Sequence, residues 1–213
     1  MSTTHYVRSR VLLEDSLAAD YTQADTHSNS DATTPTKVVT SKGDAAVAGT
    51  TIELGNFTTV ERCILYNLEA TNAIRFQARC ILTAAKAYAD IAFDGTAHTI
   101  VDGAAAGTFI TDGSLVNGFV RIASAADSEH NDARSIITVT DADTLVLTDA
   151  GEVNGDTIQT NASDSVTIQF EGTIQGTIPA GAAAIINNLV PQKDLVLTAV
   201  TAVGSFEAVI TGT

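Results

Sequence analysis

The sequence feature that most constrains the fold is the alternation of apolar with polar or small residues between Ile74 and Leu82. A period of two is typical of a β-strand with one face buried and the other in water. The run before it, Ile64-Leu65-Tyr66 with Val60 and Cys63, is apolar on both faces and predicts a more central strand. A short, more polar stretch, Asn67–Asn72, separates the two runs. We therefore predict a β-hairpin over residues 60–82, whose dry face needs a second sheet to cover it.

The negative charge of the chain is concentrated in one segment. Among 213 residues, 25 are acidic and 11 are Lys or Arg, which gives a net charge of −14. Residues 90–171 hold fourteen of the acidic residues but only Arg121 and Arg134 as basic ones, so this segment carries −12. It also contains five Asp-Gly or Asn-Gly turns among short runs rich in β-branched residues. Such a surface repels phosphate backbones, so direct binding of nucleic acid is not expected.

These patterns predict an all-β fold: a β-sandwich (jelly-roll-like) host domain with an inserted small acidic β domain. The host comprises residues 46–91 plus 172–213, and the acidic insert comprises residues 92–171. Residues 1–45 are expected to form an extended N-terminal arm, because most of this segment is polar and small with little to bury. We expect a neighbouring subunit to hold the arm, and a well-packed surface loop is the alternative.

Neither membrane insertion nor a disulfide is expected. No apolar run approaches the ~20 residues needed to span a bilayer, and residues 1–10 are polar, unlike a signal peptide. Cys63 and Cys80 fall in the two strands of the predicted hairpin but off register for a bridge, so we expect free thiols. Free thiols suit assembly in a reducing cytoplasm.

The best candidate for a metal site is the acidic loop that contains Asp127, Glu129 and Asp132, because alternating oxygen ligands suit Ca²⁺. The loop lacks the central glycine and terminal glutamate of a calcium loop, so a solvated acidic loop is the favoured interpretation. The four histidines are scattered, and no nucleophile elbow or phosphate-binding loop occurs. We therefore expect no cofactor and no enzymatic activity.

Contacts with partner subunits are expected at two places. In the arm, the few side chains that need burial are Tyr21, Val38 and Val39. On the wet face of the predicted hairpin, three arginines can form a basic stripe that pairs with carboxylates of a neighbour, namely Arg62, Arg75 and Arg79. Pairing of these arginines with Glu61 or Glu69 of the same chain is the alternative.

Several short motifs, taken in order, resemble a small β-sandwich family of tailed-bacteriophage virion proteins. The segments that carry the likeness are Thr50–Leu54, Thr59-Val60, the N-L-x-A-T-N turn Asn67–Asn72, the I-P-A-G turn Ile178–Gly181, and Asp194–Ala199. Together they imply a β-sandwich with no catalytic residues.

The acidic segment is similar to a β module that is repeated across phage head and tail proteins. The matching segments are Gly118–Ile122, Ser135–Thr140 and Thr144–Thr148. In that module the middle reads N-D-G-x-[FY]-x-I, whereas Asn131–Arg134 lacks the glycine. We therefore expect a different turn at this point.

The resemblance implies a non-enzymatic structural protein of the virion, assembled in the host cytoplasm. We expect a capsid decoration (cement) protein that bridges neighbouring subunits and so stabilises the head. Its partners are then the major capsid protein or other virion subunits, and it forms a homo-oligomer, a trimer or a ring. A neck or tail adaptor ring is the alternative. A carbohydrate- or cell-surface-binding β module is a further alternative, against which the absence of tryptophan weighs.

Overall fold

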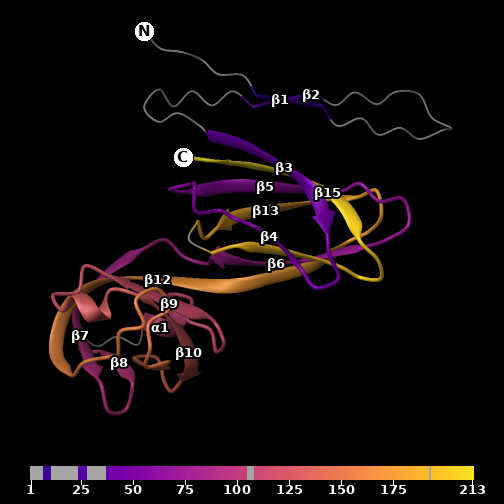
Figure 1. Cartoon of the computed structure of the whole chain (residues 1–213). Helices are drawn as coiled ribbons and strands as arrows, with labels where there is room; N and C mark the ends of the chain where they lie inside the picture. Colours follow the sequence, from indigo (N-terminus) through magenta and orange to yellow (C-terminus); the bar gives the residue numbers. More distant parts are fainter. Residues whose placement is uncertain (1–6, 11–23, 28–36, 105–107, 192) are drawn as a thin grey trace, which may run out of the picture.

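The computed structural model describes residues 7–10, 24–27, 37–104, 108–191 and 193–213 (Figure 1). Within these ranges the chain is almost entirely β-structure, with fifteen strands, one four-residue helix and one 3-10 turn. The predicted all-β class is confirmed. None of the helices in the described ranges is long and apolar enough to cross a membrane.

Eight strands surround the first of two hydrophobic cores, and Figure 1 shows them as two groups. One group follows the antiparallel order β3 (Lys37–Ala45), β15 (Gly204–Gly212), β5 (Val60–Asn67), β13 (Ala183–Leu189). The other follows the order β4 (Thr50–Ile52), β14 (Leu195–Ala199), β6 (Ile74–Ile81), β12 (Asn161–Ile178). A single residue pair, Leu189 with Cys80, joins β13 to β6. We call the strands around this core the host body.

Strands β5 and β6 do not pair with each other, so the predicted hairpin over residues 60–82 is wrong. β5 pairs with β13 and β15, whereas β6 pairs mainly with β12 and β14. The buried Asn67 secures the connection between them, because its Nδ2 donates to the carbonyl oxygens of Asn72, Ile178 and Pro179. Leu65 of β5 and Ile74 of β6 both belong to the first core. The connection is therefore an arch between the two groups of strands.

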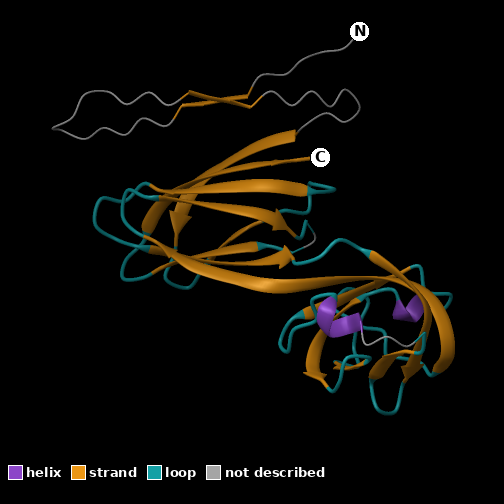
Figure 2. Ribbon diagram, turned by 180° about the vertical axis from the view of Figure 1, so that it is seen from behind, coloured by secondary structure: helices purple, strands orange, loops and turns teal. Residues whose placement is uncertain are grey.

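The second core lies inside a closed six-stranded barrel, seen from behind in Figure 2. Its strands follow the order β12, β7 (Lys86–Asp94), β8 (Thr99–Asp102), β11 (Thr144–Leu147), β10 (Ala133–Val139), β9 (Phe119–Ala123). The sheet closes because the N-terminal half of β12 pairs with β7 along one edge and with β9 along the other.

Aromatic packing fills one part of the barrel core. The short helix α1 (Thr108–Thr111) carries the fully buried Phe109. Its ring centroid lies 5.5 Å from that of Tyr88 and 6.3 Å from that of Phe170. Tyr88 and Ile91, which the sequence places in the host domain, both pack in this second core.

The eighteen-residue strand β12 connects the two bodies. Its residues up to Glu171 pair with barrel strands, and Glu171–Ile178 pair with β6 of the host body. The sequence predicts the boundary between the acidic insert and the host at Glu171-Gly172. The structure continues one strand through this point, because β6 replaces the barrel strands as the pairing partner. Gly172 also leaves room for the side chain of Leu82, whose Cδ1 lies 3.1 Å from where a Cβ would stand.

The last nine residues of the expected arm, Lys37–Ala45, are strand β3 and pair along their whole length with β15. Ala45 is fully buried in the first core, and Val39 packs against that core. Val38 is 41% exposed. These nine residues are therefore part of the host body.

Earlier in the chain, β1 (Val7–Arg10) and β2 (Ala24–His27) form a separate antiparallel two-stranded sheet. Within the described ranges, they pair only with each other. Tyr21, an expected partner contact, lies outside the described residues.

Candidate functional site

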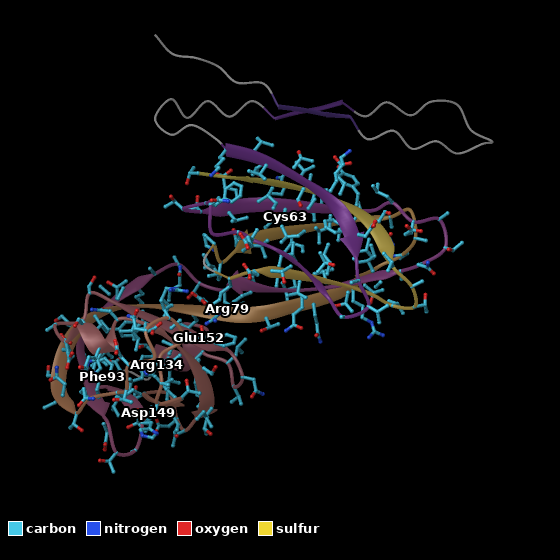
Figure 3. The ribbon with its side chains drawn as sticks, viewed as in Figure 1. Cys63, Arg79, Phe93, Arg134, Asp149 and Glu152 are labelled. Atoms are coloured by element: carbon cyan, nitrogen blue, oxygen red, sulfur yellow. The ribbon has the colours of Figure 1, made fainter. Side chains whose placement is uncertain are left out.

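Among the described residues, the largest ionic cluster lies where the host body meets the barrel, and Figure 3 labels two of its members, Arg79 and Glu152. Arg79 of β6 is 7% exposed, and its Nε lies 2.6 Å from Oε2 of the fully buried Glu171. Arg121 of β9 donates from Nε to Oε1 of the same carboxylate at 2.6 Å. Arg79 also donates to Glu152, and Nζ of Lys193 lies 3.1 Å from Glu152. Three cations and two carboxylates from both bodies thus meet at one junction.

The flat face of Arg79 is held as well. The guanidinium carbon lies 3.4 Å from the ring centroid of Phe119, which is a cation–π contact. The approach of Arg79 to Glu171 is a close ionic contact rather than an aligned hydrogen bond, since neither Nε nor Oε2 has a hydrogen-bond partner of good geometry. A buried charge that loses its partner is costly, so these contacts favour one fixed placement of the barrel against the host body.

The three arginines of the expected basic stripe lie in three different surroundings. Arg79 is buried at the junction, and its partners in the same chain are Glu171 and Glu152 rather than Glu61 or Glu69. Arg75 is exposed on β6, and Arg62 lies on β5 in the other group of strands. The expected stripe requires β5 and β6 to be neighbours. Because these strands do not pair, the three arginines do not form a stripe.

A second feature is a groove of about 550 Å³ on the host body, lined by residues of three neighbouring strands. Side chains from β14, β6 and β12 form two rows across it, namely Thr198, Arg75 and Thr177 in one row, and Val196, Gln77 and Gln175 in the other. Phe76 and Gly176 complete the lining. No carboxylate is among these eight residues.

The expected metal ligands do not converge. Asp127 caps the 3-10 turn η1 (Ser128–His130) by accepting from the backbone N–H of Glu129. Asp132 is buried and accepts from the backbone N–H groups of Ala133, Val153 and Asn154. Within the described residues, no group of three or more His, Cys, Asp or Glu side chains could hold a metal ion.

The environment of Asp132 shifts its acidity. Burial raises the pKa of Asp132, but the hydrogen bonds from Asn154, Ala133 and Val153, with Arg134 nearby, outweigh burial and hold that pKa below its ordinary value. The carboxylate therefore stays ionised and ties the start of β10 to the loop at 153–154.

Side chains stabilise the turn at Asn131–Arg134, which lacks the glycine found in the phage module. The amide of Asn131 bonds to both the N–H and the carbonyl of Ala125. Arg134 is fully buried and donates to the carbonyl oxygens of Asp149 and Glu129. Burial lowers the pKa of Arg134, and nearby aspartates oppose this shift. These hydrogen bonds join the turn to neighbouring segments of the barrel and so stabilise it.

The two cysteines are free thiols, as predicted. Burial raises the pKa of Cys63 to about 12. Burial also raises the pKa of Cys80, which is only partly buried. Thiolate chemistry is therefore suppressed at both positions.

Comparisons of the chain with protein-family models, with curated proteins and with solved structures returned no match.

Four members of the junction cluster are not singled out by the sequence, namely Glu171, Glu152, Arg121 and Lys193. They lie far apart along the chain, and only the fold brings them together. The one available signal is that Arg121 is one of two basic residues in the acidic segment.

Proposed function

We propose that this chain is a non-enzymatic structural protein of a bacteriophage virion, a capsid decoration (cement) protein that bridges neighbouring subunits. The observation that carries the proposal is the ribbon of β1 and β2, which pair only with each other among the described strands. A two-stranded ribbon alone is marginally stable in water. Its strands gain a stable setting when a neighbouring subunit supplies a further strand or an apolar surface.

The contact between two family-like turns also supports the proposal. The turn that starts at Asn67 and the turn that starts at Ile178 lie together, because Asn67 donates to the carbonyl oxygens of Ile178 and Pro179. In this proposal the host body is a β-sandwich, with its two groups of strands enclosing the first core. The resemblance in sequence thus falls on residues that hold the two groups together.

The barrel adds a rigid acidic body to the host. Its segment, residues 90–171, carries −12, and the junction cluster of Arg79, Glu171 and Glu152 fixes its placement. We assign the host body and the ribbon to contacts with the capsid, and the barrel to the outer surface. Burial of each copy between capsid subunits then stabilises the shell by mass action.

The test is a chain that lacks residues 1–36, compared with a chain in which a Gly/Ser linker of the same length replaces them. The cut lies before β3, because Lys37–Ala45 pair with β15. We expect both variants to keep the circular dichroism spectrum of the folded chain but to lose co-sedimentation with phage heads that lack this protein. Attachment equal to that of the full chain would overturn the proposal.

A neck or tail ring is the other location for such a protein. Its copy number separates it from a decoration protein, because a ring holds a fixed small number of subunits and a decorated shell holds many. Quantitative mass spectrometry of purified particles distinguishes the two.

A further inference from the structure

The groove on the host body carries Arg75, whose guanidinium has no partner among the side chains that the structure describes. Among the described residues, the guanidinium of Arg75 has no ion pair or hydrogen bond, although the chain has 25 acidic residues. The same holds for Arg62, which lies outside the groove. Arg75 stands at the centre of one row, directly between Thr177 of β12 and Thr198 of β14 in the strand register. A carboxylate can therefore approach it between two hydroxyl groups.

The neighbouring row supplies hydrogen bonds of both kinds. Gln77 and Gln175 are direct cross-strand partners on neighbouring strands, which lie ~4.8 Å apart. Each side-chain amide offers donors and an acceptor. An extended peptide presents alternating N–H and C=O groups, which the pair of amides can match.

We propose that this groove binds an acidic segment of a partner protein, with Arg75 taking a side-chain carboxylate and the two glutamines taking the peptide backbone. The inference names the chemistry of the partner that the proposed function requires, and it rests on that proposal only for the partner being a protein. A guanidinium holds a carboxylate through two parallel hydrogen bonds, which gives direction as well as strength.

Two other occupants fit the groove less well. A saccharide site commonly presents an aromatic face for stacking, but the ring of Phe76 packs against the first core, and a Cβ at Gly176 would stand 2.7 Å from it. A second copy of this chain carries the same net charge of −14, so repulsion between the copies opposes a contact that depends on this one arginine. A different protein with a locally acidic segment remains as the occupant that the lining favours.

The experiment uses the full chain with ¹⁵N-labelled glutamine and follows the side-chain NH₂ signals of Gln77 and Gln175 by NMR. The probe is the blocked peptide acetyl-Gly-Asp-Glu-Asp-Gly-amide, and its counterpart with Asn and Gln in place of the acids is the matched ligand. The variants are Arg75→Gln and, as the control, Arg62→Gln, which removes another arginine that has no partner among the described residues and lies in a different group of strands. Trigalacturonate serves as the acidic saccharide.

We expect the acidic peptide to shift both glutamine signals with a Kd of roughly 1 mM, as one charge-assisted contact and a few exposed hydrogen bonds allow. Arg75→Gln weakens this binding at least about tenfold, whereas Arg62→Gln leaves it unchanged.

Equal binding of the neutral peptide, unchanged binding by Arg75→Gln, equal loss in both variants, or no shift at all would overturn the inference. Tighter binding of trigalacturonate than of the peptide would also overturn it, in favour of a saccharide site. None of these results depends on attachment to a particle. A groove that does not bind the peptide can therefore be distinguished from an arm that is not needed for attachment to the particle.

Discussion

Replacing Glu171 by glutamine removes the central carboxylate of the junction cluster while keeping its size and one acceptor oxygen. Glu171 is 1% exposed, and both arginines that contact it do so at 2.6 Å. Loss of one partner from a buried ion pair costs ~3–5 kcal/mol. Arg79 keeps Glu152 and the ring of Phe119, and Arg121 is 23% exposed and can reach water. We therefore expect a loss near the lower limit, about 3 kcal/mol in the free energy of unfolding.

The control is Glu207→Gln, which breaks the ion pair between Glu207 and Lys42 at 3.0 Å. The side chain of Lys42 is 65% exposed, so this pair contributes at most about 1 kcal/mol. Urea unfolding followed by far-ultraviolet circular dichroism at pH 7 and constant salt measures both losses. A loss for Glu171→Gln as small as that for Glu207→Gln would refute the view that the cluster holds the two bodies together.

Three further predictions concern acidity, thiols and packing. Asp132→Asn is expected to cost roughly 2 kcal/mol at neutral pH, because Asp132 accepts three backbone hydrogen bonds as a carboxylate. Since the pKa of Asp132 lies below the ordinary value, that stability is present above pH ~4 and is lost as the pH falls through the lowered pKa. The free energy of unfolding of the variant should therefore change less with acid pH than that of the original chain. An unchanged profile would contradict the role of the carboxylate. Ellman's reagent at pH 8 should modify Cys80 faster than Cys63, and the reverse order would contradict the burial of Cys63. Gly212→Ala would place a Cβ against the backbone carbonyl oxygen of Thr59 and should lower the free energy of unfolding in urea by at least about 2 kcal/mol. Gly55→Ala, with open space around it, should lower it much less. Equal losses for the two variants would contradict the packing at Gly212.

Strands that the sequence marks locally are found where they are expected. The segments Gly118–Ile122 and Thr144–Thr148 of the acidic module become β9 (Phe119–Ala123) and β11 (Thr144–Leu147). Turn residues flank both runs, and period-two burial follows from the backbone itself. Such signals need no knowledge of which strands become neighbours.

Pairing partners are not visible in the same signals. The runs at Val60–Tyr66 and Ile74–Leu82 both form strands, but the two strands belong to different groups around the first core. Adjacency in sequence therefore predicts the wrong pairing partner. Strand β12 continues through Glu171-Gly172 because its partners change from β7 and β9 to β6 at that point. The junction cluster depends on both of these pairings, and for this reason the sequence identifies only Arg79 among its members.

The most direct test of the virion role that we propose is quantitative mass spectrometry of purified phage particles produced from a genome that carries the gene for this chain. If the chain is a decoration protein, it is present in every particle in many copies, in a fixed ratio to the major capsid protein. Absence of the chain from washed particles, together with its presence in the soluble fraction of infected cells, would contradict the account.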